Sequence, residues 1–161
     1  MSSNHPVLSQ GQVVDGFTIG SVLRTRAGAA TYSATDSSGA AVHFTAYSAE
    51  CFPTALVRER SLRELRQMQA IKDPAIVDVV AAGKLEAEGG LYEVTQAVTG
   101  ETLEGQTLSK ADAAAAISRI GDALLAAQKG GIIHRNLSSA VVIRGANGIQ
   151  VGSFAVGEPH G

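Results

Sequence analysis

The sequence predicts an α+β fold: a five-stranded antiparallel sheet with one helix, followed by a long helix and a small hairpin. Five segments have the alternating, β-branched-rich composition of strands, and two have the three- and four-residue apolar spacing of amphipathic helices. A late Gly-Ala-Asn-Gly run is typical of a hairpin turn. With 161 residues, 45% of them hydrophobic, the chain is long enough to bury one core.

The expected strands are separated by residues that favour turns. Residues 1–14 are polar and are predicted to be a flexible lead-in. A turn is strongly favoured at Asp36-Ser37-Ser38-Gly39, because Asp and Ser side chains form hydrogen bonds with the nearby backbone and Gly accepts positive φ. The five expected strands cover residues 17–23, 29–35, 41–48, 76–82 and 91–98.

Two helices are expected, one between the third and fourth strands and one after the fifth. The first covers residues 54–72 and ends before Pro74, because proline disfavours the helical region for its predecessor. The second begins at Ser109 and runs to about Lys129, where two glycines permit a left-handed exit. Strands over 140–144 and 149–154 complete the expected hairpin.

Composition excludes several classes of function. The net charge is −2, so the chain lacks the concentrated basic face that nucleic acids require, and no nucleic-acid partner is expected. No stretch approaches the roughly 20 apolar residues of a membrane span, and the N-terminus lacks the apolar run of a secretory signal. The single Cys51 cannot form an internal disulfide. We therefore expect a cytoplasmic protein.

The order of these parts and three short motifs resemble a known family. Ile132-Ile133-His134-Arg135-Asn136-Leu137 resembles the I-x-H-R-D-L catalytic loop of protein kinases. Residues 70–77 resemble the H-P-N-I-V segment that follows the regulatory helix, and residues 95–103 resemble the hinge. The resemblance is to bacterial Ser/Thr protein kinases and covers about residues 15–157. It implies a kinase N-lobe over 15–104 and a truncated C-lobe over 105–161, which ends just after the metal-binding loop.

The resemblance also identifies positions at which kinases carry charged or metal-binding groups. In this chain the nucleotide lysine, the catalytic base, the catalytic-loop lysine and the two magnesium ligands are replaced by Thr45, Asn136, Ser138, Val141 and Ser153. Glu64 matches the helix glutamate that pairs with the lysine, but here it lacks that partner. We therefore expect no catalytic residue, no metal and no cofactor, as in a pseudokinase that is not an enzyme.

Arginines stand where kinases have the glycines of the phosphate-binding loop. Arg24, Arg26 and Ala29 take the three glycine positions, so close backbone approach to a phosphate is compromised. The two arginines are interpreted as solvated side chains or, alternatively, as a self-occluding device in which one of them pairs with Glu64. A weak phosphate or phosphopeptide site is the third interpretation.

Three functional hypotheses stay open at this point. The first is an inactive, truncated pseudokinase that acts in signalling as a protein-interaction scaffold. Its long helix is then expected to contact another protein or a second copy of the chain through an exposed side that includes Ala114 and Leu125. The second is a residual nucleotide- or anion-binding sensor that uses the kinase cleft. The third is a small α+β enzyme unrelated to kinases, for which the sequence offers no nucleophile–base pair.

Overall fold

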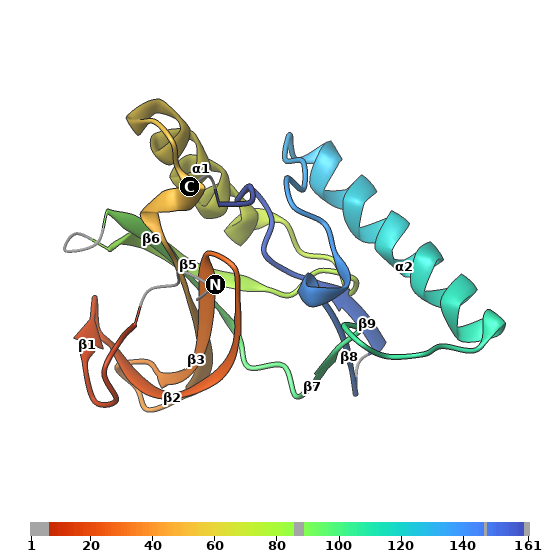
Figure 1. Ribbon diagram of the computed structural model, residues 1–161, viewed down its shortest axis with the longest axis horizontal. Coiled ribbons are helices and arrows are strands. Elements are labelled where there is room, and N and C mark those ends of the chain that lie inside the picture. The colour runs from red at the N-terminus through yellow and green to blue at the C-terminus, as the bar shows by residue number, and fades with distance from the viewer. Residues whose placement is uncertain (1–6, 86–88, 147, 160–161) are drawn as a thin grey trace.

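The largest element of the fold is a six-stranded antiparallel sheet in the order β1-β2-β3-β4-β6-β5 (Figure 1). The computed structural model describes residues 7–85, 89–146 and 148–159. The strands of this sheet are β1 (Val13–Val14), β2 (Phe17–Arg26), β3 (Ala29–Thr35), β4 (Ala41–Tyr47), β5 (Val79–Leu85) and β6 (Gly90–Gln96).

A second, three-stranded sheet in the order β7-β8-β9 follows in the chain. Its strands are β7 (Gly100–Thr102), β8 (Val142–Gly145) and β9 (Gly148–Val151). Helix α1 (Ala55–Gln67) packs against β5 and β6, and helix α2 (Lys110–Lys129) packs against β9 at the edge of the molecule (Figure 1). Short 3-10 turns occupy 49–51, 68–70 and 139–141.

Both helices begin at a side-chain cap. The hydroxyl of Thr54 accepts a hydrogen bond from the backbone N–H of Val57, and that of Ser109 accepts one from Asp112, each at 3.1 Å. Such caps satisfy backbone N–H groups that have no partner within the helix. The sequence therefore specifies where each helix starts through one short polar residue.

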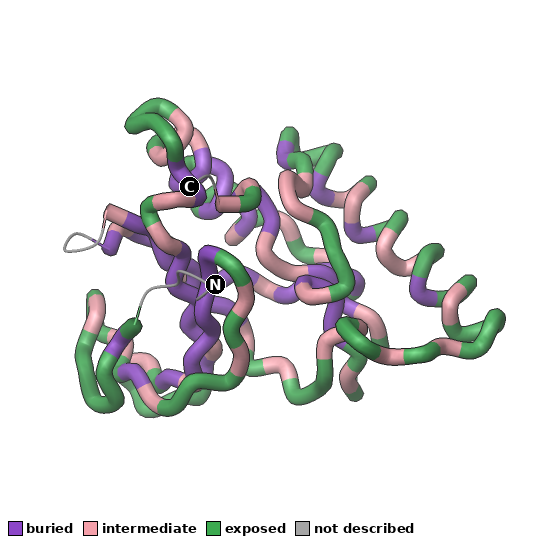
Figure 2. Tube along the Cα trace, in the orientation of Figure 1, coloured by how far each residue is buried: buried purple, intermediate pink, exposed green. Residues whose placement is uncertain are grey.

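The large sheet buries a different cluster on each face, because successive strand residues point to opposite sides. On one face Ile19, Tyr32, Phe44 and Val94 pack together under the curled N-terminal strands. The opposite face joins Tyr47 to α1, to α2 and to the segment after β9 in one shared core. Figure 2 shows this buried interior continuing from the large sheet to the inner side of α2.

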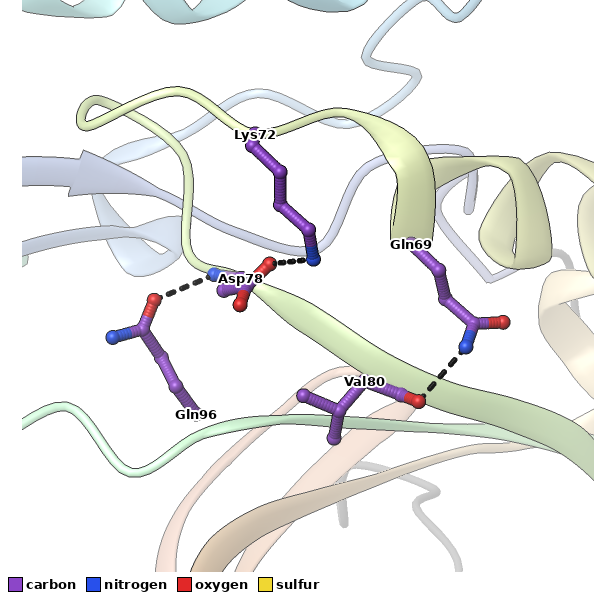
Figure 3. Close-up of polar contacts among 5 residues, drawn as sticks. All are labelled: Gln69, Lys72, Asp78, Val80 and Gln96. Carbon is purple, nitrogen blue, oxygen red and sulfur yellow. Dashed lines mark hydrogen bonds and ion pairs between the residues drawn. The ribbon is translucent and has the colours of Figure 1, made fainter.

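Polar contacts hold the connection between α1 and β5 against the sheet (Figure 3). Gln69 donates a hydrogen bond to the Val80 carbonyl at 2.8 Å, and Lys72 forms an ion pair with Asp78. The backbone N–H of Asp78 is bonded to the Gln96 side chain at 2.9 Å. These bonds fix the place where the chain leaves the helix and enters the sheet.

The predicted α+β class is confirmed, with β2 to β6 as the five expected strands and both helices near their expected bounds. Three expectations need correction. β5 begins at residue 79 rather than 76, because Ile76 instead bridges to Val151 in the small sheet. β7 was not foreseen, and it pairs with β8 although it precedes the expected boundary at residue 105.

The third correction concerns the predicted flexible lead-in. Within residues 7–14, Leu8 is only 8% exposed, its N–H is bonded to the Tyr32 hydroxyl, and Val13–Val14 form β1. Residues 1–6 lie outside the described residues. An apolar side chain in a polar stretch therefore anchors this segment to the sheet.

Candidate ligand-binding cleft

A small cleft of about 70 Å³ lies between the two sheets. Its walls come from β2, β3, β4 and β6 on one side, and from the small sheet and its flanking segments on the other. The cleft is lined by Arg24, Thr25, Arg26, Ala29, Thr31, His43, Thr45, Val77, Glu93, Thr95, Val98, Thr102, Glu104, Ala140, Val141, Ile143, Gly152 and Ser153.

Four directly opposed residues form a polar row across the sheet at this cleft. Arg24 pairs in register with Thr31, Thr31 with Thr45, and Thr45 with Glu93. The hydroxyls of Thr31 and Thr45 are hydrogen-bonded at 2.9 Å, and both threonines are buried. We call Arg24, Thr31, Thr45 and Glu93 the polar row. Thr45 thus lies on the cleft wall, where it offers a hydroxyl and no charge.

Two arginines of β2 face the cleft from the same strand. Arg24 and Arg26 are both half-buried. Arg26 lies over the ring of Tyr47, with its guanidinium carbon 5.7 Å from the ring centroid. In the described part of the chain, neither arginine forms an ion pair with a carboxylate. Burial lowers the pKa of Arg24, and the neighbouring charge of Arg26 lowers it further.

His43 adds a third nitrogen-bearing side chain to the cleft. It is half-buried and lies two residues before Thr45, on the same face of β4. Burial lowers the pKa of His43, and the charge of Arg24 lowers it further. Two arginines and this imidazole are therefore grouped on the same wall of the cleft.

A buried carboxyl closes the inner end of the cleft. Glu93 is only 2% exposed, and the Tyr47 hydroxyl donates a hydrogen bond to it. Burial raises the pKa of Glu93, while the bond from Tyr47 and the charge of Arg26 act in the opposite direction. Burial and the adjacent Glu93 raise the pKa of Tyr47 well above its usual value, and a hydrogen bond with Ser153 opposes that shift. The net effect of these causes is a pKa of Glu93 above its ordinary value.

The loop that resembles the catalytic loop packs through its histidine. His134 accepts a hydrogen bond from the Asn136 N–H at 3.2 Å, so its other ring nitrogen donates to the Gly152 carbonyl at 2.8 Å. Its ring lies against Phe154, with centroids 4.7 Å apart. Burial is the main cause of its lowered pKa. Ser138 caps the 3-10 turn by accepting a bond from the Ala140 N–H at 3.3 Å.

Glu64 has a partner, which corrects the expectation that it stands alone. Arg135 contacts both oxygens of its carboxylate, at 3.0 and 3.2 Å. The Glu64 side chain is 10% exposed and that of Arg135 is 23% exposed. Arg135 follows the long helix α2 and is therefore far from Glu64 in the sequence, so this pair could not be predicted from residue spacing. The hypothesis that Arg24 or Arg26 pairs with Glu64 is therefore wrong.

The structure separates the sequence-predicted positions into two groups. Thr45, Val141 and Ser153 line the cleft, whereas Asn136 and Ser138 are not among its lining residues. Sequence reasoning missed Glu93, although an acidic residue in an otherwise apolar strand is a usable signal for a buried polar site. No group of three His, Cys, Asp or Glu side chains that could hold a metal ion occurs within residues 7–85, 89–146 and 148–159.

The outer side of α2 carries exposed apolar residues, including those expected to be contact residues. Ile117 is 71% exposed and Leu125 is 52% exposed, and Ala114 is also exposed. Gly121 lies between them on the helix, and a Cβ added there would meet nothing within 4 Å. Ala116, Ala123 and Ala127 form the buried inner side. Of the helices in the described residues, none is long and apolar enough to cross a bilayer.

Comparison with known proteins identifies the fold. No protein-family model and no curated protein sequence matches this chain. Crystal structures of the Mycobacterium tuberculosis PknI kinase domain do match it. One of them, a single-substitution variant, superposes with a TM-score of 0.84 and 20% identity over 93% of this chain and 63% of the kinase domain. Another gives a TM-score of 0.82 with 20% identity over 94% of this chain and 64% of that domain.

These matches show that the chain has a bacterial protein kinase-like fold and that it spans under two-thirds of those kinase domains. They also correct one expectation. The prediction that this chain is not an enzyme is contradicted, because the solved structures that share its fold are kinase domains, and kinase domains are enzymes. Replacement of individual side chains did not justify that prediction.

Proposed function

We propose that this chain is a regulatory binding domain that holds an anionic ligand in the cleft between its two sheets. One observation carries the proposal: Arg24 and Arg26 face the same small cleft, half-buried, and neither forms an ion pair with a carboxylate in the residues that the structure describes. Charged groups removed from water are normally paired, because the loss of hydration is otherwise uncompensated. A bound anion supplies the missing negative charge.

The other cleft residues support the same ligand chemistry. Thr31, Thr45 and Ser153 offer hydroxyl groups, and His43 becomes a further cation when it is protonated. Glu93 accepts a hydrogen bond from Tyr47 and, in the described residues, forms no ion pair with either arginine. In this proposal, residues 15–104 supply most of the ligand contacts, and residues 105–161 supply the opposite wall and an interaction helix.

Calorimetric titration with anions tests the proposal. We expect saturable one-to-one binding of inorganic phosphate or ATP to the 161-residue chain, and loss of that binding in the double variant Arg24→Gln/Arg26→Gln. Arg63→Gln is the matched control, since it removes an exposed arginine of α1 outside the cleft. The absence of saturable binding of any anion contradicts the proposal.

A second candidate function is self-association through the outer side of α2. Exposed Ile117 and Leu125 lie on a helix face that this chain does not cover, and exposed apolar surface of this kind marks contact sites. We propose a second copy of the chain as the occupant. A two-fold axis near the middle of α2 places Leu125 of one copy against Ala114 of the other, and Gly121 against Ser118. Large side chains then meet small ones, as a self-complementary interface requires.

Sedimentation equilibrium tests this candidate function. We expect a monomer–dimer equilibrium that Leu125→Asp shifts to monomer, because the substitution places a charge in the apolar contact. Leu56→Asp is the matched control, because Leu56 is 80% exposed on α1. A chain that stays monomeric at millimolar concentration contradicts the dimer. Equal effects of the two substitutions contradict the placement of the interface on α2.

A further inference from the structure

We infer that the ligand of the cleft is a small oxyanion of the phosphate or sulfate class, held by the guanidinium groups of Arg24 and Arg26 without a divalent metal. This inference rests on the proposed function and narrows it to one class of ligand. It combines the size of the cleft, the donors that face it and the absence of an ion pair between either arginine and a carboxylate in the described residues.

Size separates a small anion from a nucleotide. The cleft holds about 70 Å³. Pockets for drug-sized organic ligands are several times larger, roughly 300–1,000 Å³. Arg26 fills part of the space through its stacking over Tyr47, and Val77 and Val141 narrow the cleft further. A tetrahedral oxyanion with its bound water fits this volume, and an adenine nucleotide does not.

The donors match an oxyanion. Arg24 and Arg26 are two residues apart on β2, so their side chains leave the same face of the strand. A guanidinium group presents a rigid fork of N–H donors that binds two oxygens of one anion at once. The lowered pKa of Arg24 reflects burial and repulsion from Arg26, and a dianion between the two groups relieves both. The Thr45 hydroxyl lies on the same wall.

Two carboxyl side chains line the cleft, those of Glu93 and Glu104, and the Glu93 carboxyl accepts a hydrogen bond from Tyr47. Mg²⁺ is usually bound through one or two carboxylates together with the phosphate oxygens. Val141 offers no oxygen from its side chain, Ser153 is neutral, and burial raises the pKa of Glu93. In this inference the two guanidinium groups do the charge neutralisation that a metal ion does elsewhere.

Titration of the 161-residue chain in chloride-free buffer with EDTA tests the inference. The probes are sodium sulfate, inorganic phosphate, phosphoserine and ATP, each repeated with excess Mg²⁺ in place of EDTA. We expect sulfate and phosphate to bind one-to-one with affinities that Mg²⁺ changes less than twofold. Phosphoserine separates the two sources of phosphate. If it binds as well as free phosphate, the site takes phosphate esters, and if it does not bind, the site takes the free anion.

Variants link the binding to the two arginines. Arg24→Gln and Arg26→Gln each weaken phosphate binding about tenfold or more, the effect of losing a charged hydrogen bond. Arg26→Lys keeps the positive charge but loses the paired N–H donors of the guanidinium group, so it weakens phosphate binding less than Arg26→Gln. Arg63→Gln leaves the affinity unchanged. Should a variant fail to fold, phosphate-induced NMR shifts of the Thr45 and Glu93 amides in the unaltered chain report the same site.

The remaining outcomes contradict either the inference alone or both the inference and the proposed function. ATP that binds only with Mg²⁺, and at least tenfold more tightly than phosphate, overturns the inference and leaves the proposed anion-binding function intact. No binding of any probe overturns both. Equal effects of Arg26→Gln and Arg63→Gln, or phosphate-induced shifts that miss Thr45 and Glu93, show a nonspecific surface anion and overturn both as well.

Discussion

The cleft and the outer side of α2 depart from the usual distribution of side chains in opposite directions. The cleft buries polar groups, since Thr45 is 7% exposed and Glu93 is 2% exposed. The helix exposes apolar ones, since Ile117 is 71% exposed. Buried polar groups and exposed apolar groups are the two informative exceptions to the rule that apolar residues lie inside.

The two regions differ in the kind of interaction that is missing from each. In the cleft, Thr31 is hydrogen-bonded to Thr45 and Tyr47 to Glu93, whereas Arg24 and Arg26 form no ion pair with the described residues. On α2, apolar area remains without cover. Added salt screens the first kind of interaction, and sulfate strengthens the second. Ligand binding in the cleft and self-association through α2 are therefore expected to respond to salt in opposite ways.

The largest expected effect comes from removal of the buried carboxyl of the polar row. Glu93→Ala leaves a cavity and removes the carboxyl acceptor of the Tyr47 hydroxyl, so it lowers the free energy of unfolding by about 3 kcal/mol. Urea denaturation followed by circular dichroism measures the change. Glu93→Gln keeps the volume and an acceptor oxygen, and its effect is expected to be under half as large. Equal losses of unfolding free energy in both variants show that the cleft wall is stabilised by the carboxyl group itself and not by its volume.

Removal of the Glu64 carboxylate has a smaller effect. Glu64→Gln leaves Arg135 half-buried without its counter-charge, which lowers the free energy of unfolding by about 1–3 kcal/mol. Glu59→Gln is the matched control, because Glu59 pairs with Lys84 at the surface and exposed pairs contribute about 0–1 kcal/mol. Thermal denaturation compares the two variants. If Glu59→Gln destabilises as much as Glu64→Gln, burial of the pair is not what gives it strength.

Gly121→Ala tests the exposed face. Because no atom outside the adjoining helix backbone lies within 4 Å of the added methyl group, the variant gains helix propensity and stabilises the monomer by about 0.5–1 kcal/mol. In the proposed dimer the same methyl group meets the second copy, so self-association weakens. Thermal melts at low concentration and sedimentation at high concentration measure the two effects. A dimer strengthened by the substitution contradicts close approach at Gly121.

The smallest effect concerns pH. Burial lowers the pKa of His43 and His134 below 6.5, so in mildly acidic solution the unfolded chain binds more protons than the folded one. Stability contributed by the neutral histidines is therefore present above pH 6.5 and is lost as the pH falls toward their folded pKa values. The double variant His43→Gln/His134→Gln is expected to show a shallower loss over this range in urea titrations. An unchanged pH profile contradicts the assignment to these two side chains.

The sequence predicted the positions of the helices and strands better than it predicted which side of each strand faces the cleft. Caps such as Thr54 and Ser109 and the period of the apolar residues locate the helices, because these are local properties. The face that β2 turns toward the cleft is not local. The β2–β3 register shifts twice, between Ile19 and Val22 and between Val22 and Arg24, and each one-residue shift exchanges the two sides of a strand.

Contacts between distant segments explain the remaining differences at the candidate site. Thr45, Val141 and Ser153 could be placed from their motifs, and the structure brings them to one cleft. The pairing of Glu64 with Arg135 joins residues 71 positions apart, and that of Tyr47 with Glu93 joins residues 46 positions apart. Neither pair leaves a periodic pattern in the sequence, because both depend on how the sheets and helices pack.

The bridge between Ile76 and Val151 has a mechanical consequence. The Val77 N–H is bonded to the Val151 carbonyl at 3.0 Å, and the Val151 N–H to the Ala75 carbonyl at 2.8 Å. These two bonds join the segment before β5 to β9 of the small sheet, and residues 97–99 connect the large sheet to the small one along the chain. The two walls of the cleft are thereby joined by backbone hydrogen bonds, so opening the cleft enough to admit a larger ligand requires those two bonds to break first.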